Sequence, residues 1–289
     1  MKKPIRKAPK AYKNIAFLNS PEARTIRLIS EYLEPMARFK KEKIIDTIVF
    51  FGSARVLPKS TTSKTLKEKR AKFLQHKELN GLDKSQLEDA LTDYEMSRFY
   101  EEGVELSYLL TKWSNKLDEG NRFVICSGGG PGIMEAANKG ASMAGGKSIG
   151  LNISLPHEQY ANPYISPGLN FEFHYFFMRK LWFMSLARAM VMFPGGFGTI
   201  DEMMEILTLI QTRKATKHLP VILYGGDYWK KVLNFKEMLR YRTISKDDLK
   251  LFTYANSPKE AFEYLKNDLT KYHLERENSF MKPAKIKIK

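Results

Sequence analysis

The sequence predicts a doubly wound α/β fold, in which a parallel β-sheet carries helices on both of its faces. Apolar runs of strand length alternate with helix-period segments from about residue 46 to residue 270. The runs are continuously apolar, which is typical of parallel strands covered on both faces. Several of them end in glycine-rich turns, and such folds bind ligands at the carboxyl ends of their strands. We therefore expect these turns to form a binding site.

The predicted elements follow one another along most of the chain. An extra N-terminal helix is expected over 20–43, and strands are expected at 47–51, 122–126, 148–153, 171–173, 189–193 and 220–224. Helical patterns occupy 94–116, 133–144, 178–188, 202–211 and 228–240. A last helix begins with Ser257 as its N-cap and Pro258 at its first helical position. Residues 57–93 form a polar, lysine-rich insertion, for which a helical hairpin, an oligomer contact and a mobile flap are all open.

The positive charge of the chain is concentrated at its two ends. Of the formal net charge of +16, six positive charges lie in 1–13 and four in 281–289, and neither stretch contains an acidic residue. We predict a flexible basic tail over 1–19, a single domain over 20–270 and a second basic tail over 271–289. Because tails carry the charge, nucleic-acid binding is not expected, and a tail-driven nucleic-acid binder is kept only as an alternative.

The composition predicts a cytoplasmic protein. The single cysteine, Cys126, excludes an internal disulfide and fits a reducing compartment. No stretch approaches the ~18 consecutive apolar residues of a membrane span, and no apolar segment of a signal peptide follows the basic start. The histidines are scattered along the chain, so we predict no metal site.

The most informative motif is Pro194–Glu202, which directly follows an apolar run. Its glycines, Gly195, Gly196 and Gly198, let the backbone curl with its N–H groups toward an anion such as phosphate. A helix predicted to begin near Ile200 adds the positive end of its dipole. Glu202 would lie one turn into that helix and would repel a bound anion. A sequence that keeps a carboxylate there predicts a chemical role for it.

Two further motifs share this context. Ser127–Glu135 also joins a strand to a helix, but it lacks both the G-x-G-x-x-G spacing of dinucleotide-binding turns and the Gly-Lys-Ser/Thr of a P-loop. Standing alone, it could be a tight turn without a ligand. The segment Phe176–Lys180 places two cations at a predicted helix start. They are either a solvated basic pair or, for Arg179, a partner that could hold Glu202.

Four segments taken together carry a family resemblance. They are Gly-Ser-Ala-Arg at 52–55, Gly-Gly-Gly-Pro-Gly-Ile-Met-Glu-Ala-Ala-Asn at 128–138, Phe-Phe-Met-Arg-Lys at 176–180 and Pro-Gly-Gly-Phe-Gly-Thr-Ile-Asp-Glu at 194–202. This combination resembles the Lonely Guy (LOG) family, whose members were formerly misnamed lysine decarboxylases. The resemblance spans roughly residues 46 to 240. It implies a Rossmann-like nucleotide-binding domain and an N-glycosidase that hydrolyses a nucleoside 5'-monophosphate, AMP or a cytokinin-type AMP modified on its amine, to free base and ribose 5-phosphate.

The resemblance also implies roles for individual residues. Arg179 and Glu202 would be the catalytic pair, with Arg179 orienting Glu202 and keeping it ionised. Residues of the four segments would bind the phosphate and ribose of the substrate, namely Gly52, Ser53, Arg55, Gly128, Gly129, Gly130, Gly132, Met134, Glu135, Lys180, Gly195, Gly196, Gly198 and Thr199.

The resemblance implies no cofactor and no metal. Lysine decarboxylation would require a lysine that carries pyridoxal phosphate, and nothing around Lys180 suggests that use. A homodimer or a larger homo-oligomer is implied, because sites of this family lie near subunit interfaces. The alternative is a protein of the same fold that binds and senses a nucleotide without cleaving it.

Overall fold

A single parallel β-sheet organises the chain. The computed structural model describes residues 8–75, 81–117, 120–156 and 160–275. Within these ranges seven strands lie in the order β4-β3-β2-β1-β5-β6-β7, every pair parallel. The chain builds outward from β1 to β4 and then crosses back to β5, so the strand order reverses between β1 and β5. This switch point is where doubly wound sheets bind their ligands.

Six of the strands lie where the sequence predicts them, within two residues at each end. Their bounds, with those of the seventh, are β1 Thr47–Phe51, β2 Val124–Ser127, β3 Ser148–Ile153, β4 Asn170–Phe173, β5 Ala187–Met192, β6 Val221–Tyr224 and β7 Thr253–Ala255. The sequence does not predict β7, because it is a three-residue, partly exposed edge strand. So short a run does not stand out from a turn in the sequence.

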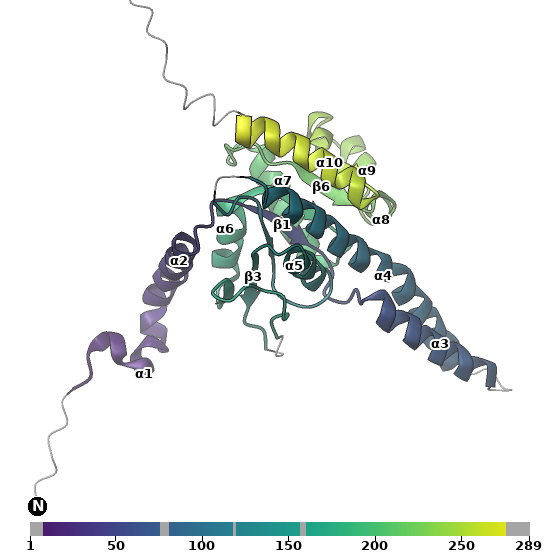
Figure 1. Cartoon of the computed structure of the whole chain (residues 1–289), viewed down its shortest axis with the longest axis horizontal. Coiled ribbons are helices and arrows are strands. Elements are labelled where there is room, and N and C mark those ends of the chain that lie inside the picture. The colour runs from purple at the N-terminus through teal and green to yellow at the C-terminus, as the bar shows by residue number, and fades with distance from the viewer. Residues whose placement is uncertain (1–7, 76–80, 118–119, 157–159, 276–289) are drawn as a thin grey trace, which may run out of the picture.

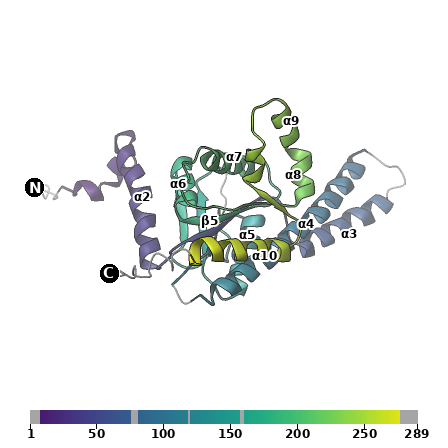
Figure 2. The same ribbon diagram turned by 90° about the horizontal axis from the view of Figure 1, so that it is seen from above.

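Helices cover both faces of the sheet (Figure 2). On one face lie α2 (Arg24–Lys41), α6 (Phe176–Leu186), α7 (Phe197–Gln211), α8 (Gly226–Val232) and α9 (Phe235–Arg240). On the other face lie α4 (Gly81–Ser114), α5 (Ile133–Met143) and α10 (Pro258–Leu269). Along β1, Val49 and Phe51 enter the first buried cluster, whereas Ile48 and Phe50 enter the second. This double burial explains why the strands are apolar without alternation, and it confirms the predicted fold class.

The lysine-rich insertion forms a helical hairpin. Helix α3 (Lys59–Gln75) runs beside the first half of α4, and the pair projects away from the sheet (Figure 1). A hydrogen bond from Lys69 Nζ to Gln86 Oε1, 2.6 Å long, joins the two helices. Of the three possibilities left open by the sequence, the structure shows the hairpin.

The N-terminal segment contains short helices, and the flexibility predicted for 1–19 stays a prediction. Residues 11–18 form two short helices, η1 (Ala11–Lys13) and α1 (Ile15–Leu18), and η2 (Pro21–Ala23) then leads into α2. Residues 1–7 and 276–289 of the two predicted tails lie outside the described residues. Helix α2 is connected to helix α6 through Glu31, whose backbone oxygen accepts a 2.9 Å hydrogen bond from the indole of Trp182.

Two further differences concern helix boundaries. The helix predicted over 228–240 is divided into α8 and α9, with Asn234 capping the second by accepting a hydrogen bond from Glu237 N. After α9 the chain forms η3 (Asp247–Lys250), and the last described turn is η4 (Thr270–Glu275). None of the helices in the described part of the chain is long and apolar enough to cross a membrane.

Candidate active site

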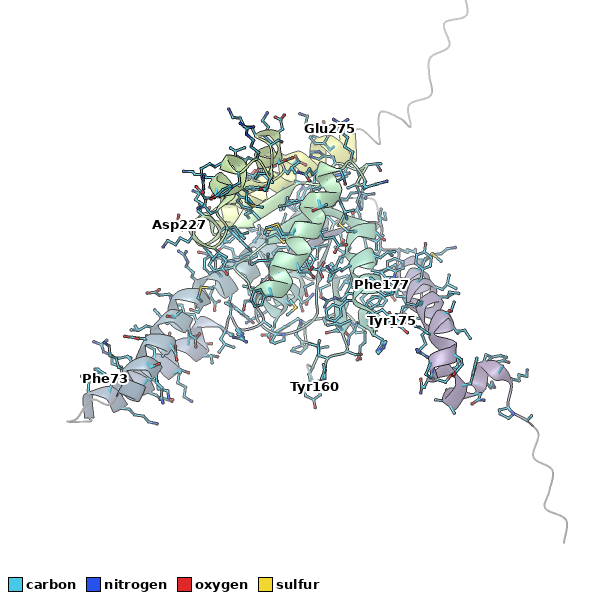
Figure 3. The ribbon with its side chains drawn as sticks, turned by 180° about the vertical axis from the view of Figure 1, so that it is seen from behind. Phe73, Tyr160, Tyr175, Phe177, Asp227 and Glu275 are labelled. Carbon is cyan, nitrogen blue, oxygen red and sulfur yellow. The ribbon has the colours of Figure 1, made fainter. Side chains whose placement is uncertain are left out.

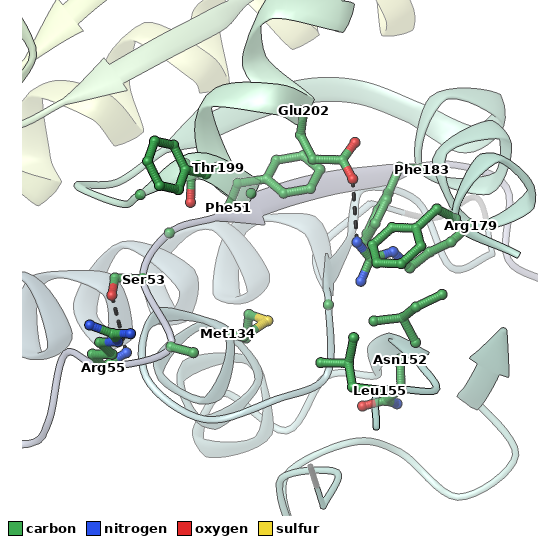
Figure 4. A pocket seen from close by; sticks show the side chains of 18 residues that line it. Phe51, Ser53, Arg55, Met134, Asn152, Leu155, Arg179, Phe183, Thr199 and Glu202 are labelled. Carbon is green, nitrogen blue, oxygen red and sulfur yellow. Dashed lines mark hydrogen bonds and ion pairs between the residues drawn. The ribbon is translucent and has the colours of Figure 1, made fainter. Parts of the chain in front are cut away.

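The main cavity lies at the switch point of the sheet. It has a volume of about 690 Å³, and residues from all four motif segments line it (Figure 4). The loop after β1, the turn after β2, the end of β3, helix α6 and the start of α7 each contribute to its wall. Segments far apart in the sequence therefore meet where the sheet topology predicts a ligand.

Backbone contacts lock the three glycine turns together. Ser53 N donates a 3.0 Å hydrogen bond to Pro194 O, and Ser53 O accepts one of 3.1 Å from Ile133 N. Gly132 has a φ of +70°, and a Cβ atom there would lie 2.3 Å from Ser53 O. A side chain at this position would separate the turn after β1 from the turn after β2, which explains the requirement for glycine.

The turn after β5 is shaped to receive an anion. Helix α7 begins at Phe197, three residues before the position that the sequence analysis predicted near Ile200. Gly196 precedes it without a capping side chain, so the N–H groups of the first helical turn are available to a bound anion. Thr199 packs directly against the turn, since a Cβ on Gly195 would lie 2.1 Å from its hydroxyl oxygen. Tyr228 supports the turn from behind by donating a 2.9 Å hydrogen bond to Gly195 O.

Glu202 and Arg179 lie next to each other in the wall of the cavity. Because α7 begins early, Glu202 lies in its second turn rather than beside the N-terminal N–H groups. Its carboxylate is buried, with 5 % of the residue exposed, and it points toward the Arg179 guanidinium of α6 (Figure 4). Their closest atoms, Arg179 Nη2 and Glu202 Oε1, are 3.5 Å apart. The Nε of Arg179 is buried without a hydrogen-bond partner among the described residues.

Burial dominates the charge state of this pair. It raises the pKa of Glu202 to about 7, against the lowering effects of Arg179 and Lys180. Burial likewise lowers the pKa of Arg179, while Glu202 acts in the opposite direction. Arg179 acts in the predicted direction, toward ionised Glu202, but desolvation of the carboxylate outweighs its effect on the pKa. Glu202 can exchange a proton near neutral pH, as a general acid or base must.

The cavity brings together most of the predicted substrate-binding residues, but not all of them. Those that line it together with Arg179 and Glu202 are Gly52, Ser53, Arg55, Gly128, Met134, Gly196, Gly198 and Thr199. Six others do not line it: Gly129, Gly130, Gly132, Glu135, Lys180 and Gly195. Substrate contacts by these six stay predictions.

Of the six residues outside the lining, Lys180 contacts acids of α7, and the other five lie behind the cavity. The carbonyl oxygens of Gly129 and Gly130 accept hydrogen bonds of 3.0 and 3.1 Å from the buried amide of Asn162. Glu135 accepts a 2.6 Å hydrogen bond from the hydroxyl of Tyr100. Gly132 and Gly195 shape the turns, as described above. These residues build the wall of the site from behind.

Several lining residues were not predicted from the sequence. They are Phe51, Ala54, Asn152, Ile153, Leu155, Phe176, Phe183 and Phe197. Ala54, Phe176 and Phe197 lie within the recognised segments. Phe51, Asn152 and Ile153 lie at the carboxyl ends of predicted strands, so position alone could have identified these six. Phe183 lies on α6. It is a core residue that also faces the cavity.

Other candidate chemistries find little support in the geometry. Among the described residues, no group of three or more His, Cys, Asp and Glu side chains is placed to hold a metal ion. Cys126 is buried on β2, and burial raises the pKa of its thiol, so little reactive thiolate forms. The cavity with its glycine turns and its buried pair is therefore the candidate active site.

The fold and the site together define an α/β protein with an uncapped glycine turn and a buried carboxylate–guanidinium pair at its switch point. A family profile described as possible lysine decarboxylase matches residues 134–265, which include the Arg179 and Glu202 segments. The match confirms the family resemblance that the motifs predict.

Comparison with solved structures finds similar chains at low identity. The X-ray structure of TM1055 is 20% identical, with a TM-score of 0.45, covering 77% of this chain and 99% of that chain. The molybdenum cofactor carrier protein from Chlamydomonas reinhardtii is 17% identical, with a TM-score of 0.45, covering 78% of this chain and 99% of its own. A second structure of that carrier is 19% identical, with a TM-score of 0.41, covering 60% of this chain and 89% of that chain. No curated protein sequence matches the chain.

Proposed function

We propose that this protein is a nucleoside 5'-monophosphate phosphoribohydrolase, which cleaves AMP, or an AMP modified on its amine, to free base and ribose 5-phosphate. The observation that carries the proposal is the shared cavity of the anion-binding turn and the Arg179–Glu202 pair. Its volume of about 690 Å³ lies in the range of small-molecule sites. The family match over both motifs supports the same chemistry.

The geometry suggests how the substrate would lie. Its 5'-phosphate would occupy the turn formed by Gly196, Gly198 and Thr199, where the N–H groups of α7 are available. The ribose would extend along the cavity toward Glu202. The phosphate would thereby supply binding energy remote from the bond that breaks and would hold the sugar in place.

The reaction would proceed by attack of water on the anomeric carbon of the ribose. The ionised Glu202 carboxylate would accept a proton from that water and stabilise the oxocarbenium-like positive charge that develops on the sugar. The bond to the base nitrogen would break, and the base would leave with the electron pair and take up a proton. Arg179, 3.5 Å away, would orient the carboxylate. Because ionised Glu202 is the reactive form, kcat/KM should rise with pH through about 7, the pKa that burial gives this carboxyl.

The test is to incubate the purified full-length chain with AMP and to quantify adenine and ribose 5-phosphate. We expect release of both products, and Glu202→Gln should lower kcat by about 10²–10⁴-fold, the range for loss of an acid–base group. Glu263→Gln is the matched control, since this glutamate is exposed on α10, away from the cavity. Saturable AMP binding without product would refute catalysis and favour the non-catalytic nucleotide sensor.

Base preference depends on the wall of the cavity beyond the sugar. Ile153, Leu155 and Phe176 make this part of the lining apolar, and Asn152 adds an amide. A panel of nucleoside monophosphates, with released base measured, would establish which base is accepted. Exclusive cleavage of pyrimidine nucleotides would overturn the proposal of an adenine-type substrate.

We also propose that the protein forms a homodimer through α2 and α6. On α2, four apolar side chains at spacings of three and four residues are 42–52 % exposed: Ile26, Ile29, Leu33 and Met36. Phe177 on the neighbouring helix α6 is also exposed and lies beside α2 (Figure 3). Light scattering should show a dimer that Ile29→Glu with Leu33→Glu converts to a monomer. A monomeric wild type would refute the proposed dimer.

A cytoplasmic location is proposed on the single, buried Cys126.

A further inference from the structure

Arg179 and Lys180 are consecutive residues of α6, but their side chains contact different parts of the protein. Arg179 lines the cavity, whereas Lys180 is directed to the neighbouring helix α7. There its Nζ lies 2.7 Å from Asp201 Oδ2 and 2.7 Å from Glu205 Oε2. Only 17 % of the Lys180 side chain is exposed, so the ammonium group is held between the two helices. This geometry differs from the solvated cation that the sequence allowed.

The two acids that Lys180 bridges lie on either side of Glu202 along the helix. Asp201 and Glu205 are spaced i and i+4, where like charges face each other and repel. Their carboxylates also raise the pKa of Glu202, whereas Lys180 lowers it. The one positive charge of Lys180 therefore offsets part of the effect of two anions that disfavour ionised Glu202.

The bridge is also the tighter ionic connection between α6 and α7. The Arg179–Glu202 contact spans 3.5 Å, which is long for an ion pair, while both contacts of Lys180 are 2.7 Å. So long a single contact is too weak to hold Arg179 and Glu202 at a fixed distance from each other. Lys180 is covalently next to Arg179. The contacts of its ammonium group with α7 therefore restrain how closely Arg179 approaches Glu202.

We propose that Lys180 is a positioning residue, which fastens α6 to α7 through Asp201 and Glu205 and thereby sets both the distance and the charge state of the Arg179–Glu202 pair. Its kinetic consequence rests on the proposed function, but its effect on Glu202 does not. Besides these five groups, the charged side chain lining the cavity is Arg55, from the loop after β1. It belongs to the opposite end of the cavity from Arg179 (Figure 4).

The direct test measures protonation of Glu202 without any substrate. The full chain is labelled with carbon-13 at glutamate side-chain carboxyls, its NMR signals are followed against pH, and Glu202→Gln assigns the relevant signal. In Lys180→Met the midpoint should move upward, by about one pH unit, because the cation is lost and two carboxylates are left uncompensated. Glu205→Gln should move it downward, because this substitution removes a neighbouring anion. Lys180→Arg should restore the wild-type midpoint.

Kinetics provide the second readout. The rise of kcat/KM with pH should move to higher pH in Lys180→Met, with about a tenfold loss on the acid side. Adding Asp201→Asn and Glu205→Gln should recover part of that loss. A merely structural role would lower activity equally at every pH. An unchanged Glu202 midpoint in folded Lys180→Met would overturn the proposal, whether or not the wild type cleaves AMP. Absence of AMP cleavage with the predicted NMR shifts would overturn only the proposed function.

Discussion

Replacing Glu202 by glutamine should make the protein more stable at alkaline pH. Folding buries this carboxyl and raises its pKa from 4.5 to about 7. The native state therefore holds a proton that the unfolded chain has released between these two pH values. Stability falls as pH rises through this window, because above it the native protein must bury an ionised carboxylate. Glutamine stays neutral and avoids this penalty.

The size of the effect follows from the shift. Each unit of pKa difference corresponds to about 1.4 kcal/mol, and a shift from 4.5 to about 7 gives a full effect of about 3 kcal/mol. Part of it has already developed at about pH 5, where most unfolded chains are ionised, so the difference between about pH 5 and about pH 8 is about 2–3 kcal/mol. Comparing two pH values cancels pH-independent effects, such as altered packing of glutamine against Arg179.

Urea unfolding of wild type and Glu202→Gln at the two pH values measures this difference. The gain of the variant in free energy of unfolding should be larger at about pH 8 than at about pH 5, by about 2–3 kcal/mol. Glu263→Gln, an exposed position on α10, should show no such difference. Equal effects of Glu202→Gln at both pH values would refute burial as the cause of the raised pKa.

Two other substitutions test the framework of the site. Gly132→Ala should destabilise the protein by several kcal/mol in urea unfolding and weaken AMP binding, because its Cβ would lie 2.3 Å from Ser53 O. Gly145→Ala is the control, since Gly145 has a similar φ of +71° but nothing within 4 Å of an added Cβ. It should lower the free energy of unfolding only by the ~1 kcal/mol of backbone strain. Asp46→Ala should lower the free energy of unfolding by about 3–5 kcal/mol, because it removes the carboxylate that lies 2.9 Å from buried Arg122 at the opposite end of the sheet. A loss below about 1 kcal/mol would contradict that role.

The fold was predictable where local pattern and tertiary environment agree. Val49 and Phe51 pack on one face of the sheet and Ile48 and Phe50 on the other, so a continuous apolar run identified a central parallel strand. The glycine turns were predictable for a similar reason, since their backbone conformation requires particular residues. The order of the strands was not predictable in this way, because any order satisfies the same apolar runs.

The site was predictable as a set of residues but not as a network of contacts. Arg179 and Glu202 were recognisable from their segments, but whether desolvation or Arg179 controls the carboxyl depends on a separation that no local pattern encodes. Lys180 illustrates the same point. Its sequence context fits a solvated cation, a phosphate ligand or a link between helices, and only the placement of α7 beside α6 identifies the acids that it contacts.

The start of α7 resolves the conflict between an anion site and a carboxylate in one motif. With the helix beginning at Phe197, the free N–H groups belong to its first turn, and Glu202 follows about 7 Å further along the axis at ~1.5 Å per residue. Repulsion between a bound phosphate and Glu202 is reduced by that separation, and the sugar can lie between them. The same displacement places Glu202 beside Arg179 and between the two acids that Lys180 bridges. One helix thus carries both the proposed anion-binding turn and the proposed acid–base group, and Lys180 connects it to the helix that supplies Arg179.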